Sequence, residues 1–231
     1  MNRHHIIRMG NANAWLIEGD DGTLLVDAGV PNKEGIFFSR LREEGIDATS
    51  IRLIVITHVH YDHVGSLAAI RKACRCPVAV HESEADLLRE GTVVIPPGTR
   101  WFSKPGLGIA RRAPLLKQLL RFEAVEPDIL VGDEMPLAEF GFPGRVLHTP
   151  GHTRGSVSIL RDTGEAVVGD LASNDWPLGL GPIFNPFGVD GGMMLDSWQR
   201  LIDAGARTIF PAHGPSFPVQ RLREALRKHR R

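Results

Sequence analysis

The sequence predicts an α/β protein in which two β-sheets pack face to face with helices outside them. Short apolar runs alternate with amphipathic helical patterns along most of the chain. Turn-forming residues separate these runs, and histidine or aspartate follows several of them. A chain of 231 residues can bury a substantial core, and α/β domains of this length are commonly single. We therefore expect one domain over residues 1–231.

The first half of the chain predicts strands that lead into helices. Strands are expected over residues 5–9, 14–18, 22–27, 53–56 and 78–80. Apolar residues at helical spacing predict a helix that ends near Gly45 and a second that follows the strand at 53–56. Ser83 and Asp86 resemble an N-terminal capping pair for a third helix, which ends at Glu90.

The second half adds strands near residues 145–148, 156–160, 165–169 and 207–211. A helix that ends at Gly205 is expected from an apolar face made of Leu195, Trp198, Leu201 and Ile202. The basic stretch from Arg221 to Arg231 also carries apolar residues at helical spacing. It predicts a surface helix with one stripe of side chains in the core.

A loop rich in metal-ligand side chains follows the strand at 53–56. Residues 57–63 read Thr-His-Val-His-Tyr-Asp-His, which puts four candidate ligands close together: His58, His60, Asp62 and His63. Imidazole nitrogen and carboxylate oxygen are ligands that borderline divalent ions such as zinc prefer. A single histidine is more often a surface or capping residue, but four ligands at this spacing predict a metal site.

Three further candidate ligands follow later apolar runs. His152 lies in the stretch 149–153, Asp170 closes the run 166–170, and His213 follows the run 208–212. Each lies just past a strand-like segment, as the loop at 57–63 does. All of these residues are therefore expected on loops at the ends of strands.

The order of these residues resembles the signature of the metallo-β-lactamase superfamily, and the resemblance spans most of the chain. It implies a four-layer αβ/βα sandwich with a dinuclear metal site at one edge of the sheets. It also implies the ligands: His58, His60 and His152 for one ion, Asp62, His63 and His213 for the second, and Asp170 as the bridge. Asp27 matches an early strand-end aspartate of the family and is expected to orient a ligand imidazole. A turn residue before Gly29 is the alternative for Asp27.

The chemistry that the resemblance implies is hydrolysis of an ester-like bond. A water that bridges two divalent ions loses a proton near neutral pH, and the resulting hydroxide attacks a carbonyl carbon that a metal polarises. Asp62 is the expected catalytic residue, because its free oxygen can orient this nucleophile and pass its proton to the leaving group. Zinc is the expected metal, and manganese, iron and cobalt suit the same ligands.

The class of substrate is limited mainly by comparing this sequence with the residues that each branch of the family uses. An acidic bridging ligand such as Asp170 is typical of the glyoxalase II, lactonase and phosphodiesterase branches and disfavours a β-lactam. The glutathione-gripping helices of glyoxalase II have no counterpart after His213, and the only tyrosine is Tyr61, so the usual phenol of lactonases is missing. We expect hydrolysis of a small, partly apolar thioester or lactone. A phosphodiester or β-lactam hydrolase and an iron-dependent redox or sulfur-handling protein are the alternatives.

The charge balance, the N-terminal residues and the cysteine content indicate which binding partners and which location to expect. Basic and acidic residues number 27 each, so no overall field favours nucleic acid or membrane, and a small-molecule substrate is expected. The N-terminal residues lack the apolar segment of a secretory signal, and no apolar run is long enough to span a bilayer. A cytoplasmic location is therefore expected. Cys74 and Cys76 are expected to be free thiols.

Two segments are expected to surround the site. Residues 92–125 interleave apolar residues with basic ones: Arg100, Lys104, Arg111, Arg112, Lys117 and Arg121. This insertion is either a lid with a cationic rim, an ordinary solvated helix–loop segment, or the contact between two subunits of a homodimer. Residues 174–192 follow Asp170 and carry apolar and aromatic side chains that can wall a pocket.

Overall fold

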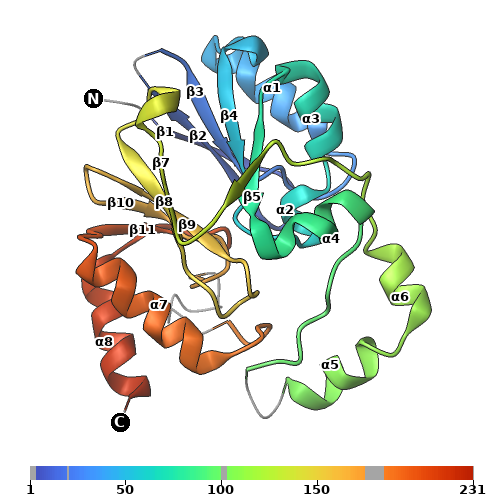
Figure 1. Cartoon of the computed structure of the whole chain (residues 1–231), viewed down its shortest axis with the longest axis vertical. Helices are drawn as coiled ribbons and strands as arrows, with labels where there is room; N and C mark the ends of the chain where they lie inside the picture. The colour runs from blue at the N-terminus through green and yellow to red at the C-terminus, as the bar shows by residue number, and fades with distance from the viewer. Residues whose placement is uncertain (1–3, 20, 100–102, 175–184, 231) are drawn as a thin grey trace.

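The computed structural model describes residues 4–19, 21–99, 103–174 and 185–230. Two six-stranded sheets face each other, and helices cover their outer faces (Figure 1). The predicted four-layer αβ/βα sandwich is confirmed. None of the helices in the described ranges has the length and apolar character that crossing a membrane requires.

The first sheet is built from the N-terminal half of the chain in sequence order. Its strands are β1 (His4–Arg8), β2 (Asn13–Glu18), β3 (Thr23–Val26), β4 (Ile51–Val55), β5 (Val78–His81) and β6 (Ile129–Val131). The first three strands pair antiparallel, and β3 to β6 pair parallel. Parallel neighbours need long crossovers, and these contain α1 (Glu34–Glu44), η1 (Ala48–Ser50), α2 (Tyr61–Val64), α3 (Leu67–Cys74), η2 (Glu82–Glu84) and α4 (Ala85–Glu90).

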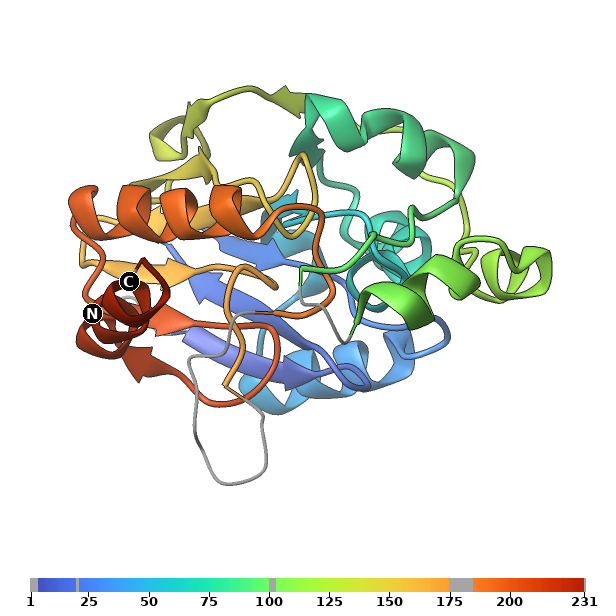
Figure 2. The same cartoon turned by 90° about the horizontal axis from the view of Figure 1, so that it is seen from below.

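The second sheet comes from the C-terminal half. Its order is β12 (Phe217–Pro218), β11 (Thr208–Phe210), β10 (Glu165–Val167), β9 (Val157–Arg161), β8 (Gly144–His148) and β7 (Glu134–Pro136). The 3-10 turn η3 (Ala138–Phe140) joins β7 to β8. Helices α7 (Gly191–Asp203) and α8 (Val219–His229) pack side by side against its outer face (Figure 2).

Three apolar cores hold the four layers together. Alternate residues of one strand face opposite sides of a sheet. In β3, Leu24 and Val26 therefore pack between the two sheets, whereas Leu25 packs under the helices of the first sheet. The third core lies between the second sheet and α7 and α8, and Trp198 is fully buried there. The apolar stripe of the C-terminal helix is confirmed, because Val219, Leu222 and Leu226 are buried in this core.

The structure departs from the predicted elements at two points. The segment after residue 60 forms two helices, α2 and α3, rather than one. The predicted capping pair is wrong, since α4 has Glu84 as its N-terminal flanking residue and no side chain caps it. Ser83 lies instead in the turn η2, where its N–H donates to His81 Nδ1 at 3.2 Å.

The insertion between β5 and β6 contains two short helices, α5 (Lys104–Ala110) and α6 (Pro114–Leu119), whose bounds were not predicted from the sequence. Both stand away from the two-sheet body (Figures 1 and 2). Cys74, at the end of α3, and Cys76 are buried free thiols, as expected.

Candidate metal centre

The first sheet delivers its candidate ligands at the carboxyl ends of two neighbouring parallel strands. Strands β3 and β4 pair with Val26 opposite Val55, so the residues that follow them leave the same edge of the sheet. The N–H of Asp27 donates to the carbonyl oxygen of Val55 at 3.0 Å. Asp27 therefore lies beside the loop that carries His58 and His60, and α2 then presents Asp62 and His63.

The second sheet delivers its residues to the same edge. Strands β10 and β11 are parallel neighbours, and Asp170 and His213 follow them. His152 lies in the connection between β8 and β9. Gly169 has a φ of 52°, and a Cβ there would lie 2.6 Å from Thr57 Oγ1. A glycine before Asp170 is therefore what allows the two sheets to approach at this point.

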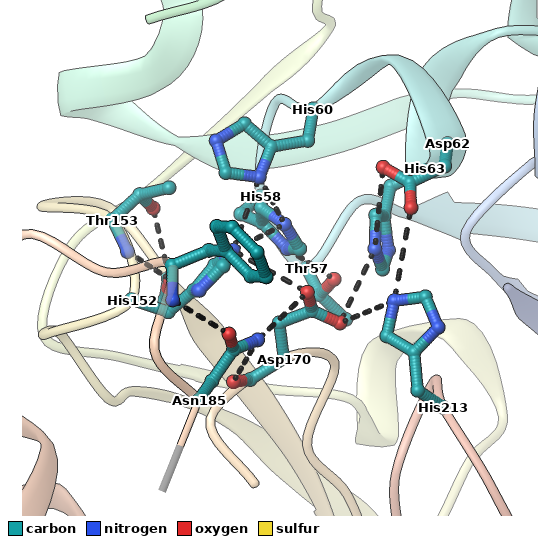
Figure 3. Close-up of polar contacts among 12 residues, drawn as sticks. Thr57, His58, His60, Asp62, His63, His152, Thr153, Asp170, Asn185 and His213 are labelled. Carbon is teal, nitrogen blue, oxygen red and sulfur yellow. Dashed lines mark hydrogen bonds and ion pairs between the residues drawn. The ribbon is translucent and has the colours of Figure 1, made fainter. Parts of the chain in front are cut away.

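Three histidine nitrogens meet in a tight triangle (Figure 3). His58 Nε2 lies 3.0 Å from His60 Nδ1, and His152 Nε2 lies 3.1 Å and 3.0 Å from these two atoms. Each nitrogen donates or accepts one hydrogen bond, so three in mutual contact cannot all satisfy one another. A tetrahedral zinc ion with bonds of about 2.0–2.1 Å holds nitrogen ligands roughly 3.3 Å apart. The triangle therefore fits a metal ion better than a hydrogen-bond network.

A second cluster shares Asp170 with the first. Asp170 Oδ1 lies 3.4 Å from His63 Nε2 and 3.2 Å from His213 Nε2. The other oxygen, Oδ2, lies 3.5 Å from His152 Nε2. Asp62 completes the second cluster, with Oδ2 at 3.7 Å from His213 Nε2. The structure thus brings all seven predicted ligands together around one carboxylate that faces both groups.

Buried atoms in this cluster lack the hydrogen bonds that folded proteins normally provide. Within the described part of the chain, His63 Nε2 and Asp170 Oδ1 are buried and have no hydrogen-bond partner. Both atoms point into the second cluster, where a cation would satisfy them. The donor set of imidazole and carboxylate therefore fits a pair of divalent ions.

Asp27 contacts a candidate ligand, His63, and belongs to neither cluster. Its Oδ2 accepts from His63 Nδ1 at 2.8 Å, and its Oδ1 accepts from Thr57 N–H at 2.8 Å. Such a carboxylate fixes the orientation and tautomer of the imidazole it contacts. Asp27 also has a φ of 62°, a left-handed conformation that aspartate tolerates better than most residues.

Sequence reasoning missed three residues that position the ligands. Asn11 donates from Nδ2 to Asp62 Oδ2 at 3.0 Å and accepts from His213 Nδ1 through its carbonyl oxygen at 2.8 Å. Glu84 accepts from the N–H groups of Val59 and Gly155 at 2.8 Å and 3.2 Å. Asn185 donates to Asp170 Oδ2 at 3.2 Å. None of the three lies in a recognisable motif, so no local pattern distinguishes them.

The two clusters have opposite preferences for protons. Burial lowers the pKa of His152 to about 3, against the opposing charge of Asp170. Burial also acts to lower the pKa of His213, but the negative charge of Asp170 beside it raises the pKa to about 9. Burial opposes the charged form of Asp170, yet His213, His152 and His63 hold its pKa well below the usual range. The first cluster thus presents neutral imidazoles, and in the second cluster a cation would displace protons.

A cavity of about 530 Å³ opens over the clusters. One side carries His60, Asp62, His152, Asp170 and His213, and the other side is apolar: Val93, Val94, Ile95, Pro96, Leu120 and Phe187. Most of the apolar side belongs to the insertion at 92–125, so this part of the insertion covers the site. Of the segment 174–192, Asn185, Pro186 and Phe187 line the cavity. Trp176, Pro177, Leu178, Ile183 and Phe184 lie outside the described residues.

The expectation that every candidate ligand lies on a loop is wrong for Asp62 and His63, which lie on α2. A two-sheet sandwich that carries a His and Asp cluster on the loops and a short helix of one edge defines a metal-dependent hydrolase. The model of the metallo-beta-lactamase superfamily matches residues 7–213, and the chain belongs to this superfamily. The resemblance of the signature at 58–213 is thereby confirmed.

Relatives of known name agree with this class. The chain is 29% identical over 231 aligned residues to acyl-coenzyme A thioesterase MBLAC2 of Homo sapiens, covering 91% of this chain and 76% of that protein. It is 29% identical to probable metallo-hydrolase YflN of Bacillus subtilis (strain 168), a match that covers 63% of this chain and about half, 53%, of the relative. The crystal structure of BLEG-1 B3 metallo-beta-lactamase shares the fold, with a TM-score of 0.71, 22% identity, and coverage of 96% and 97% of the two chains.

Proposed function

We propose that this chain is a dinuclear zinc hydrolase that cleaves a small, partly apolar thioester or lactone. One observation carries the proposal: Asp170 contacts histidines of both ligand clusters, and the clusters line a cavity together with apolar residues of the insertion. His58, His60 and His152 would hold one ion, and Asp62, His63 and His213 the second. When bound, two such ions acidify a water molecule and polarise a substrate carbonyl.

Asp62 is the residue we assign to proton transfer. Its Oδ2 is held by the Asn11 amide at 3.0 Å, while Oδ1 lies 4.0 Å from His63 Nε2 and has no such bond. Asp62 also lines the cavity. Oδ1 is therefore free to take a proton from the attacking water and to deliver it to the leaving group.

Tyr61 adds a hydrogen-bond donor to the same cavity. Burial raises the pKa of its phenol, and the charge of Asp62 raises it further. The hydroxyl therefore stays protonated through the neutral range. It can donate to a carbonyl oxygen of a bound substrate, which supports cleavage of a carboxyl derivative.

The apolar wall supports a substrate with a hydrocarbon part. Val93, Ile95 and Pro96 are buried, and each methylene that a substrate buries against such a wall contributes about 0.8 kcal/mol of binding. The thioester assignment has further support from the human relative, which is an acyl-coenzyme A thioesterase.

Initial hydrolysis rates on zinc-loaded protein test the proposal. Acyl-homoserine lactones of increasing chain length are compared with acyl thioesters that carry matched chains. We expect turnover of thioesters, lactones or both that rises with chain length, together with two zinc ions per chain. Inactivity on both series with two zinc ions present would contradict the proposal and would favour a phosphodiester or a β-lactam as the substrate. A single iron per chain would instead favour redox chemistry.

A further inference from the structure

Positive charge is concentrated in the part of the insertion next to the cavity. Residues 91–122 contain no aspartate or glutamate and six basic residues: Arg100, Lys104, Arg111, Arg112, Lys117 and Arg121. The whole chain has equal numbers of basic and acidic residues, 27 each. This segment, which we name the basic arm, is therefore a local exception to a balanced surface.

Both ends of the basic arm are fixed at the cavity. Val93 to Pro96 line the wall at one end, and Leu120 lines it at the other. Thr99 Oγ1 donates to the carbonyl oxygen of Asn185 at 2.7 Å, and Ser103 Oγ donates to that of Pro186 at 2.9 Å. Lys104 directly follows Ser103, and Arg121 directly follows Leu120. Lys104 thus follows a residue that is hydrogen-bonded to the cavity wall, and Arg121 follows a residue of the wall itself. Helices α5 and α6 extend outward between them (Figure 2).

Among the described residues, four cations of the arm have no acidic partner, unlike several arginines elsewhere on the surface. Arg71 pairs with Asp128 at 2.8 Å, Arg89 with Glu126 at 2.9 Å, and Arg230 with Asp196 at 2.9 Å. In the described ranges, no carboxylate pairs with four exposed cations of the arm: Lys104, Arg111, Arg112 and Arg121. Like charges without counter-charges repel, and a bound anion relieves that repulsion.

We infer that the basic arm binds phosphate groups of the substrate, and that the substrate is an acyl thioester of a phosphorylated thiol carrier such as coenzyme A. This inference rests on the proposed function and chooses the thioester over the lactone. Arginine and lysine are the side chains suited to phosphate, whereas a neutral lactone offers the arm nothing to bind. The acyl chain lies against the apolar wall, and the carrier extends outward along the arm.

The reaction consumes one water molecule. A C–O bond forms at the acyl carbon, the C–S bond breaks, and the products are a carboxylic acid and the free thiol of the carrier. The phosphates lie many bonds from the thioester, so the arm affects binding of the carrier and leaves the chemical step to the residues around the metals.

Two substrates that differ only in the carrier test the inference. A coenzyme A thioester is compared with the N-acetylcysteamine thioester of the same acyl group, which lacks phosphates. In Arg111→Ser/Arg112→Ser protein we expect kcat/KM for the coenzyme A thioester to fall about tenfold, since exposed ion pairs contribute about 0.2–1 kcal/mol each. The value for the N-acetylcysteamine thioester should not change. Arg223→Ser/Arg227→Ser removes two exposed charges from α8 and should leave both values unchanged.

Calorimetric titration with free coenzyme A gives a readout that needs no turnover. We expect binding that weakens with salt and weakens about tenfold in the Arg111→Ser/Arg112→Ser protein. The inference would be overturned if the arm variant and the α8 variant lost coenzyme A affinity equally. It would also be overturned if the arm variant lost the same fraction of kcat/KM on both carriers. Thioester cleavage would then remain as a function without a role for the arm. If neither thioesters nor lactones are cleaved, the proposed function fails, and the titration still decides whether the arm binds the carrier.

Discussion

Asp170 is the side chain that faces both groups of candidate ligands. Its Oδ1 is directed to His63 and His213, and its Oδ2 to His152 and the amide of Asn185. A carboxylate in this place supplies an acceptor to each side and a negative charge that offsets two cations. A neutral residue of the same shape cannot supply both an acceptor to each cluster and a negative charge.

Replacement of Asp170 by asparagine is therefore expected to remove metal as well as activity. The amide keeps the shape but puts an NH₂ donor where one cluster needs an acceptor. Substitutions that only support a ligand cost 10–100-fold in metal affinity or activity, so we expect kcat/KM to fall roughly 100-fold or more and metal content to drop below two ions per chain. Asp196→Asn, at an exposed carboxylate that pairs with Arg230, is the matched control. Two firmly held ions in the Asp170→Asn protein would contradict the role given to this residue.

The ligands could be predicted because their spacing along the chain is itself informative. His58 to His63 occupy one loop, and His152, Asp170 and His213 each end an apolar run. Asn11, Glu84 and Asn185 could not be predicted in this way. Their partners lie 51, 25 and 15 residues away along the chain, and only the folding of separate connections onto one edge brings them together.

Among the elements, the turn η2 joins the ligand loops of the two sheets. Glu84 is buried, and its two carboxylate oxygens accept from Val59 N–H, between His58 and His60, and from Gly155 N–H, near His152. This use of Glu84 also explains the failed capping prediction, because its side chain is directed to the loops and not to the end of α4. Short strands such as β7 and β12, with three and two residues, were not predicted because they are too short to show an alternating pattern.

Glu84→Ala is expected to lower the free energy of unfolding by about 2–4 kcal/mol, because two buried N–H groups lose their acceptor. Glu84→Gln keeps one acceptor oxygen and should lose about half as much. Denaturant unfolding at fixed pH measures both values, and Glu82→Ala, at the exposed neighbouring glutamate, is the control. Equal stability of the alanine and glutamine variants would show that one of the two bonds contributes nothing.

The apolar wall of the insertion gives a prediction about chain length. Val94→Ser/Leu120→Ser places hydroxyls on the wall that we assign to the acyl chain. Since each buried methylene contributes about 0.8 kcal/mol, we expect kcat/KM to fall more for long acyl thioesters than for the acetyl thioester. Leu115→Ser is the control, because Leu115 is 69% exposed and does not line the cavity. A uniform loss across all chain lengths would place the acyl chain elsewhere.

At the scale of the whole molecule, both sheets contribute ligands, so the site exists only when they are packed together. The alternation of apolar strands and amphipathic helices predicted two packed sheets with helices outside, because each layer must bury its apolar face against the next. The place of the site at one edge came from the family resemblance. The same packing buries five of the seven candidate ligands at one edge, while His60 and His213 are half-buried. The protonation of those ligands is therefore coupled to the folding of the whole chain.

The stability of the metal-free protein is accordingly expected to be highest near pH 6.5 and to fall on both sides. Burial lowers the pKa of His152 to about 3. Below pH 6.5 the unfolded chain therefore binds a proton at this residue that the folded chain does not bind, and the free energy of unfolding decreases as the pH is lowered. His213 has its pKa raised to about 9, because Asp170 outweighs burial; its contribution is complete below pH 6.5 and is lost as pH rises through 9. Urea unfolding of chelator-treated protein from pH 5 to 9 measures the profile. Zinc should remove the alkaline fall, since metal replaces the proton on His213, and an alkaline fall that persists unchanged with zinc would exclude His213 as its cause.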